Sequence, residues 1–413
     1  MAGSCAGPRY LVDLPIFGVY RFWLGFAALA AFLWEGLTGL MLLMYYDPSN
    51  PYSSTVGLIS SSRLGEVLLA THLYGAYLLI LLAYAHGALE FLRRVYRRNG
   101  VQWVLGVLLF ALTIATAYFG YVLTGDVLAV DAINVGVGVL GSLGLNWLTP
   151  VFYGQLSGPG MFIRLLGWHI ALSIVLLMLL TIHHYLTEVN VPPRFRDCGW
   201  PQRLMALASV TLATWGVALA TPSALIILGH YVKLPILASP LPGPPPTSPQ
   251  AAGIPPYPPW FLLYMYKLMD APLGLTTDVA ISAIVPLAVL LSMPLIRSYD
   301  AADTLFLTGL TWLILYSAWG ALSPGEAIGF LQFALATAIV PPASYIVVRL
   351  IRRFRPRAPG FKALCMPNLT YALALASVAS TAYSLATEGA LSGLALGASL
   401  IMLGASLNSY RRC

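Results

Sequence analysis

The amino-acid sequence predicts an all-α polytopic membrane protein with about ten transmembrane helices. Hydrophobic residues fill 59% of the 413 positions, and charged residues only 9%, against about 25% in soluble domains. Apolar segments of roughly 20 residues, long enough to cross a bilayer as helices, recur along the chain. Because backbone groups in lipid must be hydrogen-bonded within their own segment, these spans are expected to be helices. A soluble globule, a disordered chain and a coiled coil are excluded.

Ten apolar segments have the required length. They cover residues 20–46, 66–92, 103–124, 163–187, 204–229, 277–297, 303–322, 327–350, 368–387 and 389–408. If both termini are cytoplasmic, 18 of the 22 Lys and Arg residues lie on the inner side. Since basic residues are retained on the cytoplasmic side, the sequence predicts a multi-pass plasma-membrane protein in contact with lipid, with both termini inside. The net charge of +7 is then a property of the loops, and no nucleic-acid partner is expected.

Two long loops fall on the same, outer side. The loop at about 125–162 is rich in Gly, Val and Leu and is expected to contain short interfacial helices. The loop at about 230–276 is proline-rich and is expected to be extended and stiff. Together they could cover a site on that face. We expect three parts: a helical bundle at 1–230, a second part with the proline-rich loop and three helices at 231–352, and a two-helix C-terminal extension at 353–413.

Histidines recur at one interval in two of the predicted spans. His72 and His86 are 14 residues apart in the second span, and His169 and His183 are 14 apart in the fourth. Fourteen residues turn a helix by about 1400°, close to four full turns, and rise about 21 Å. Each span therefore carries two histidines on nearly one face, at two depths. Because two facing imidazoles can ligate one haem iron, the pairs His72–His169 and His86–His183 are predicted to be the metal ligands of two stacked b-type haems.

Glycines repeat the same interval in the two remaining spans of the bundle. Gly25 and Gly39 are 14 apart in the first span, as are Gly106 and Gly120 in the third. Glycine lets a flat macrocycle approach a helix backbone, so the four spans predict an N-terminal four-helix bundle holding two haems. A single such pair is more often part of ordinary helix packing, but four equal intervals favour haem. His184 is the alternative inner ligand, and the matching interval favours His183.

At this point the chain resembles cytochrome b of the quinol-oxidising cytochrome bc complexes, over about residues 20–350. We expect a divergent, prokaryotic or archaeal member. The residues that carry the resemblance are Thr38-Gly39-Leu40, the H-x-x-G-A pattern from His72, GYVL at Gly120–Leu123, Arg164 five positions before His169, and Pro258-Pro259-Trp260-Phe261, where the family has Pro-Glu-Trp-Tyr. In this comparison Arg164 is a candidate to bind the outer haem. The last two spans have no counterpart in the family's eight-helix pattern.

The resemblance implies the electron-transfer subunit of a respiratory quinol oxidoreductase. Quinol would be oxidised at the outer face, with one electron passing to a Rieske iron–sulfur protein. The other electron would cross through the outer and inner haems to a quinone near the inner face, with protons released outside and taken up inside. The family organisation also implies further redox subunits and a homodimer.

The quinol site departs from the family pattern. Pro259 replaces the glutamate thought to accept a quinol proton, and Phe261 replaces the tyrosine, while Trp260 is kept. Quinol oxidation releases two protons, so a base is required within reach. We hypothesise that Asp126 or Asp131 supplies it; the alternative is that these aspartates face water or cap a short helix.

Glu35 is a further candidate, because an ionisable residue within a span is costly and often functional. Either proton transfer or a structural hydrogen bond would explain it. Two other functions also stay open for the chain. One is a diheme anchor that links quinone to another dehydrogenase or reductase. The other is a non-redox transporter with broken helices, for which Pro341-Pro342 is the one hint.

Overall fold

The computed structural model describes residues 23–61, 64–156, 160–189, 200–229, 242–254, 257–354 and 367–412. Within these ranges the regular structure is helical, and nine helices are long and apolar enough to cross a membrane. The predicted all-α membrane fold is confirmed. The ninth predicted span, 368–387, is also a helix, α16 (Pro367–Ala386), but it is not among the nine helices that are long and apolar enough to cross a membrane.

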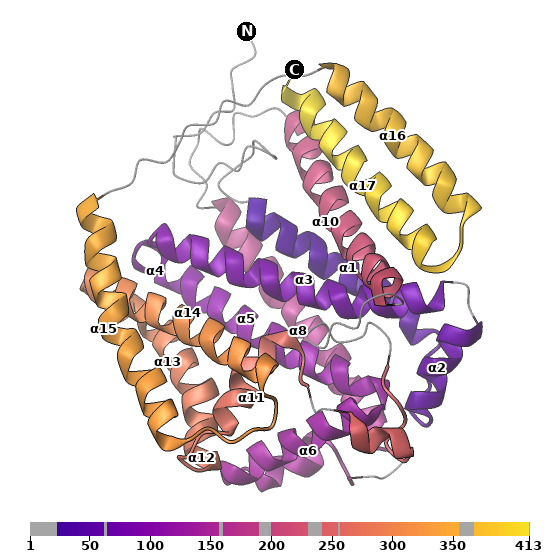
Figure 1. Cartoon of the computed structure of the whole chain (residues 1–413). Coiled ribbons are helices and arrows are strands. Elements are labelled where there is room, and N and C mark those ends of the chain that lie inside the picture. Colours follow the sequence, from indigo (N-terminus) through magenta and orange to yellow (C-terminus); the bar gives the residue numbers. More distant parts are fainter. Residues whose placement is uncertain are drawn as a thin grey trace.

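The first four predicted spans form the expected bundle (Figure 1). They are α1 (Trp23–Leu43), α3 (Gly65–Leu92), α5 (Gly100–Tyr121) and α8 (Met161–Val189). Helix α1 packs along α3, and α5 packs along α8. Two short helices lie in the connections, α2 (Pro51–Ser61) and α4 (Val95–Arg98). This pairing brings the histidine-bearing helices α3 and α8 each against one glycine-bearing helix.

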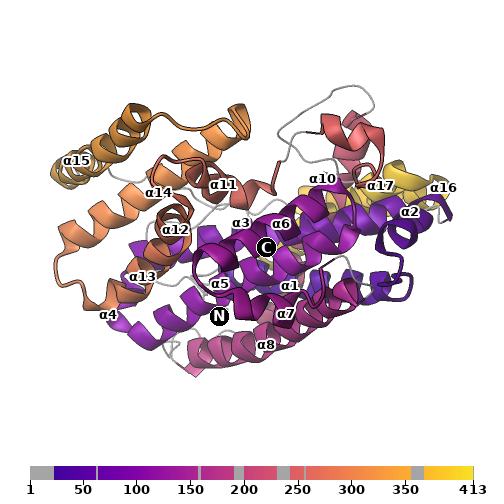
Figure 2. The ribbon, with the colours of Figure 1, turned by 90° about the horizontal axis from the view of Figure 1, so that it is seen from below.

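A second group of helices packs on one side of the bundle, as Figure 2 shows from below. The sixth span consists of α12 (Leu275–Val279), a π-helical turn (Ala280–Ile284), α13 (Val285–Ser292) and a short 3₁₀ turn (Met293–Leu295). It is followed by α14 (Tyr299–Leu322) and α15 (Phe330–Phe354). Helix α15 continues through Pro341 and Pro342, so this pair does not give the broken helix that the transporter alternative requires.

The C-terminal hairpin lies on the opposite side of the bundle, against α10 (Trp200–Gly229). It consists of α16 and α17 (Gly389–Arg412). Small residues bring α17 very close to α10: a Cβ on Gly404 would lie 2.7 Å from the Ser209 carbonyl oxygen. The hydroxyls of Ser377 and Ser399, 3.0 Å apart, join α16 to α17. Close packing of small residues with hydroxyl hydrogen bonds is typical of helix association in membranes, so these contacts are those of structural packing.

The two predicted outer loops meet each other. The first contains α6 (Val127–Ser142) and α7 (Thr149–Phe152), which confirms the expected short helices. The backbone N–H of Val127 donates to the Pro244 carbonyl oxygen at 3.1 Å. The prediction that both loops lie on one face is therefore confirmed. The domain boundary expected at residue 230 lies outside the described residues, so the division into three parts stays a prediction.

The proline-rich loop is less extended than its composition predicts. It contains 3₁₀ turns at Pro249–Gly253 and Trp260–Leu262, and then α11 (Leu263–Met269), which packs on α14. Pro249 occupies the start of its turn, where proline's missing N–H would have no partner within the turn. Prolines therefore set where these turns begin and do not prevent them.

Candidate functional site: two histidine pairs and an outer-face cavity

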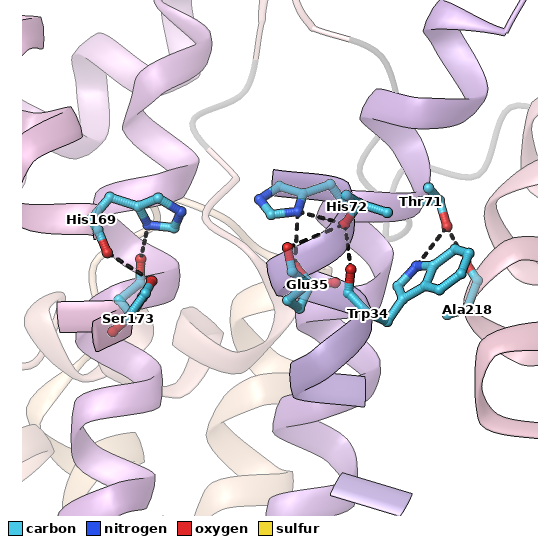
Figure 3. Close-up of polar contacts among 9 residues, drawn as sticks. Trp34, Glu35, Thr71, His72, His169, Ser173 and Ala218 are labelled. Atoms are coloured by element: carbon cyan, nitrogen blue, oxygen red, sulfur yellow. Dashed lines mark hydrogen bonds and ion pairs between the residues drawn. The ribbon is translucent and has the colours of Figure 1, made fainter. Parts of the chain in front are cut away.

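Two histidines face each other near one end of the bundle. The ring centroids of His72 on α3 and His169 on α8 are 6.2 Å apart, with the ring planes at 84° (Figure 3). Hydrogen bonds fix the orientation of both rings. Nδ1 of His169 lies 2.9 Å from the Thr116 carbonyl oxygen, which can only accept, so Nδ1 carries the proton. The lone pair of Nε2 is then free to bind a metal.

The same argument applies to His72. Its Nδ1 lies 3.0 Å from Thr38 Oγ1. The Thr38 hydroxyl itself donates to the Trp34 carbonyl oxygen at 2.8 Å, so it accepts from His72. Nδ1 therefore carries the proton, and Nε2 is again left with its lone pair.

A second pair lies one 14-residue interval further along both helices. The ring centroids of His86 and His183 are 6.4 Å apart, with the planes at 85°. His184 is exposed and lies edge-on to Phe26, with centroids 6.5 Å apart. Of the two neighbouring candidates, the structure therefore brings His183 and not His184 to face His86. Nδ1 of His86 and of His183 is buried without a hydrogen-bond partner among the described residues.

The spacing of both pairs fits axial ligation of one metal ion between each. With metal–nitrogen bonds of about 2 Å and roughly 1.1 Å from a ring nitrogen to the imidazole centroid, two trans ligands have centroids about 6.2 Å apart. The observed centroid separations of 6.2 and 6.4 Å agree with this value. The donor set is also appropriate, because two imidazoles are a normal axial pair for a non-covalently bound haem.

Each predicted glycine lies directly against one of the four histidines. A Cβ at Gly39 would be 3.0 Å from His72 Cε1, and one at Gly120 would be 2.7 Å from His169 Cε1. The other two glycines, Gly25 and Gly106, face His86 at 3.1 Å and His183 at 3.5 Å in the same way. These glycines were expected to admit a macrocycle. In the structure they make room for the imidazoles themselves, a role that the 14-residue interval alone did not reveal.

Substitution of Gly39 by alanine is expected to disturb the outer histidine pair. The added methyl group would press on His72, and overpacking of this kind costs about 1–3 kcal/mol. Gly36 on the same helix is the matched control, since a Cβ there meets nothing within 4 Å. Thermal unfolding in detergent should show a lower midpoint for Gly39→Ala than for Gly36→Ala. Equal midpoints for the two variants would contradict the packing role.

A cavity of about 1150 Å³ begins at the inner pair and reaches the outer loops. It exceeds the range of typical small-molecule sites, about 300–1,000 Å³. Its lining is mostly apolar, with aromatic and polar side chains at intervals. It includes His86, His183, Asp131, Tyr257, Pro258 and Pro259.

The two candidate aspartates have different surroundings. Asp126 is 5% exposed and is the N-cap of α6: its Oδ1 accepts from the Ala129 N–H at 2.9 Å. Its Oδ2 accepts from the N–H of Gly243 in the proline-rich loop at 2.7 Å. Asp126 therefore caps α6, as the alternative in the sequence analysis proposed, and it also links the two outer loops by a hydrogen bond.

Asp131 lies one turn further on and lines the cavity. It makes no hydrogen bond to another described residue, and burial, with a smaller contribution from the charge of Asp126, raises the pKa of its carboxyl above the ordinary value. Tyr121 and Tyr266 also line the cavity. Each of them interacts electrostatically with Asp131. Of the two aspartates, Asp131 is the one placed to meet a bound molecule.

Pro258 and Pro259, the first two residues of the Pro-Pro-Trp-Phe segment, line the cavity. Pro259 is fully buried. Phe261 is 2% exposed and packs edge-on to Tyr77, with centroids 5.9 Å apart. Trp260 lies 6.3 Å from Tyr84 between ring centroids. Trp260 and Phe261 thus anchor the outer loop on α3.

Glu35 lies beside a histidine of the outer pair, whereas Arg164 lies at the surface next to the first outer loop. Glu35 Oε2 is 3.2 Å from His72 Nδ1 (Figure 3), so this carboxyl belongs to the outer pair. Arg164 is exposed, and its guanidinium side chain lies against Gly154 in the outer loop. Its predicted role towards a haem stays a prediction.

Sequence reasoning did not find two polar contacts near the inner end. Gln102 Nε2 donates to the His183 carbonyl oxygen at 2.9 Å and to Thr187 Oγ1 at 2.6 Å. Arg94 forms a bidentate pair with Asp303, across 209 residues of sequence. Neither contact has a sequence signal, because each depends on which helices become neighbours. Glu90 and Arg93, on the same turn at the C-terminal end of α3, form an ion pair at 2.7 Å.

The fold and the site define a class: a polytopic helical membrane protein with two facing histidine pairs in a four-helix bundle. Residues 77–243 match the family model described as Cytochrome b(N-terminal)/b6/petB. The chain is 36% identical to a protein of Sulfolobus acidocaldarius named cytochrome b, over 77% of this chain and 63% of that protein. It is 27% identical to the cytochrome bc complex cytochrome b subunit of Chlorobaculum thiosulfatiphilum, over 60% of this chain and 59% of that protein.

Residues 77–243 of the chain thus form a cytochrome b family domain, and the two relatives, which match over a longer stretch, are both named cytochrome b proteins. The chain is an integral membrane protein with a domain of a family that binds haem. A solved structure titled hyperthermophilic respiratory Complex III shares its fold, with a TM-score of 0.59 at 19% identity, covering 81% of this chain and 92% of that one. The chain spans about 60% of the length of the two relatives named above.

Proposed function

We propose that this chain is a diheme cytochrome b subunit of a respiratory quinol-oxidising complex in the plasma membrane. The main support for the proposal is that one helical bundle holds two facing pairs of histidines, one above the other. A cavity runs from the inner pair to the outer loops. The names of relatives support the proposal: besides the Chlorobaculum protein, a 31% identical match in Bacillus subtilis is named menaquinol:cytochrome c reductase cytochrome b subunit. That match covers 24% of this chain and 46% of the relative.

In this proposal one b-type haem lies between His72 and His169, and a second between His86 and His183. Haem, when bound, supplies an iron centre that takes up and releases one electron at a time. The four histidines would supply the nitrogen ligands, and Nδ1 of His72 and of His169 is held by a hydrogen bond. Gly25, Gly39, Gly106 and Gly120 keep the helices close to these rings.

Quinol binds at the outer end of the cavity, between α6 and the Pro-Pro-Trp-Phe segment. Its oxidation to quinone releases two electrons and two protons. We assign Asp131 as the acceptor of one proton, since Pro259 at the wall has no basic group. One electron passes to a Rieske iron–sulfur protein, and the other crosses the bundle to a quinone near the inner face. Further redox subunits and a homodimer complete the proposed complex.

A dithionite-reduced minus oxidised spectrum of the purified protein, with pyridine haemochrome quantitation, tests the proposal. We expect two b-type haems per chain, because both histidine pairs have the same ligand spacing. One haem per chain would refute the diheme assignment. Correctly folded, haem-free protein from cells supplied with haem would refute electron transfer altogether.

A further inference from the structure

We propose that two tyrosines in the outer part of the cavity, Tyr118 on α5 and Tyr153 directly after α7, make this part of the site selective for quinol over quinone. Their paired hydroxyls offer a bound molecule an oxygen that accepts a hydrogen bond, and no hydrogen in return. The inference rests on the proposed function, because it requires that the cavity binds quinol. It goes further in assigning the discrimination between the reduced and the oxidised form to two side chains.

The direction of each hydrogen bond in the pair follows from the groups involved. Tyr118 Oη lies 3.0 Å from the Ala132 carbonyl oxygen on α6. A carbonyl oxygen can only accept, so Tyr118 donates its one proton there. The two hydroxyl oxygens, Tyr118 Oη and Tyr153 Oη, are 2.7 Å apart. Because the Tyr118 proton is already used, Tyr153 is the donor in this second bond, and both protons are committed.

The Tyr153 oxygen keeps its lone pairs for a further partner. Within the described part of the chain, the bond to Tyr118 is the one hydrogen bond that the Tyr153 hydroxyl makes, and both tyrosines line the cavity. A quinol hydroxyl can donate to this oxygen. A quinone has carbonyl oxygens instead, which only accept, so it finds no hydrogen at this place. A site that hydrogen-bonds a substrate hydroxyl discriminates against the analogue that lacks it.

Gly136 on α6 allows the two hydroxyls to occupy this position. A Cβ on Gly136 would overlap both Tyr118 Oη and Tyr153 Oη. Gly136 follows Ala132 by four residues, which is about one turn of the helix. Its missing side chain therefore leaves the Ala132 carbonyl oxygen open to Tyr118. Because Gly136 itself lines the cavity, the hydroxyl pair lies against the cavity wall that α6 forms.

Packing holds the pair in this arrangement. Tyr153 is 3% exposed and belongs to a buried cluster with Phe119, Ile133 and Leu165, which come from α5, α6 and α8. Tyr118 packs against the same cluster. Turning either hydroxyl proton towards the cavity would leave a buried polar group without its partner, which is unfavourable. The acceptor character of the pair is therefore fixed by the fold.

The pair and Asp131 lie on one wall of the cavity. Asp131 and Gly136 both line the cavity from α6, and five residues correspond to about 7.5 Å along a helix. Asp131 is the group assigned above to accept a quinol proton, and Tyr153 is a second acceptor on the same wall. This arrangement suits a molecule with two hydroxyls better than one with two carbonyls.

Two substitutions should change the selectivity in different ways. Initial rates of quinol oxidation by the intact complex give the KM of the quinol and the competitive inhibition constant of its quinone. A short-chain benzoquinol and a short-chain naphthoquinol serve as the probes. Tyr153→Phe removes the acceptor, so the quinol KM should rise about fivefold, the effect of one neutral hydrogen bond, with the quinone constant unchanged. Tyr118→Phe frees the Tyr153 proton for the ligand, so the quinone constant should fall about fivefold with the quinol KM unchanged.

Tyr316→Phe is the matched control. The Tyr316 hydroxyl pairs with Thr337 Oγ1 at 3.0 Å between α14 and α15, and Tyr316 lies outside the set of described residues that line the cavity. Both constants should therefore keep their wild-type values. Haem content, measured in parallel, should stay at the wild-type value in all three variants.

An unchanged quinol KM in Tyr153→Phe would overturn the inference. So would a shift of both constants together in the two cavity variants, which a general loosening of the site would produce. If Tyr153→Phe fails to bind haem, Tyr118→Phe decides alone, and an unchanged quinone constant there overturns the inference. A wild-type complex that oxidises neither quinol would instead refute the proposed function, so the two failures are distinguishable.

Discussion

Replacing His183 by leucine is expected to halve the haem content of the protein, from two haems per chain to one. His183 faces His86 at a centroid distance of 6.4 Å, and no other histidine ring among the described residues is paired with His86. The remaining haem should be the outer one, with its spectrum and potential close to the wild-type values. Pyridine haemochrome quantitation and a redox titration measure both quantities.

His184→Leu is the matched control, one position further along the same helix. His184 is exposed and packs on Phe26, so its loss should leave two haems per chain. Adjacent helical positions differ by about 100° in direction, which is why two neighbouring histidines cannot both face His86. If His184→Leu loses the inner haem while His183→Leu keeps it, the assignment of the inner ligand is wrong.

The bundle and its histidine pairs could be predicted because both follow from the period of the α-helix. A 14-residue interval is close to a whole number of helical turns, so sequence alone places His72 and His86 on one face. Arginine placement then fixes the order of the crossings, which puts the two histidine helices parallel. The preference for His183 over His184 followed from the same interval, and the structure places His183 opposite His86.

The polar contacts around the pairs could not be predicted, because they depend on lateral neighbours. Glu35 was recognised as unusual, but its place beside His72 requires the α1–α3 packing and the missing side chain at Gly75. Gln102 reaches the His183 carbonyl oxygen only because α5 packs on α8. Local sequence patterns carry no information on such pairings, whereas helical periodicity is a local property.

Asp126 illustrates the same limit at the outer face. The sequence left open whether Asp126 or Asp131 acts as a base, since both follow GYVL. The N–H of Gly243 donates to Asp126 from 117 residues away, and only the fold brings that group within reach. With both oxygens of Asp126 occupied by hydrogen bonds, the proposal concentrates on Asp131.

Asp131→Asn is accordingly expected to slow quinol oxidation by about two orders of magnitude, the lower end of the contribution of a positioned general base. Asparagine has nearly the same size but cannot accept a proton, so the haem content should not change.

The pH dependence of the rate gives a second expectation. Burial, and then the charge of Asp126, raises the pKa of Asp131. Because only the ionised carboxylate can take a proton from quinol, the wild-type rate should rise with pH through that raised pKa. The variant should lose this part of the pH profile. Stopped-flow reduction of the haems by quinol in the intact complex, measured across pH, gives both results.

Asp126→Asn separates this role from a structural one. An amide cannot replace a carboxylate that accepts from both Ala129 and Gly243, and leaving a buried donor unpaired costs about 1–3 kcal/mol. We therefore expect Asp126→Asn to lower the thermal unfolding midpoint and to keep the pH-dependent limb, displaced to lower pH because the charge of Asp126 no longer raises the pKa of Asp131. Asp131→Asn should do the reverse, with the midpoint maintained and the pH-dependent limb lost. An Asp131→Asn protein with the wild-type rate and profile would remove Asp131 from the proton path and leave the base to be sought elsewhere along the cavity wall.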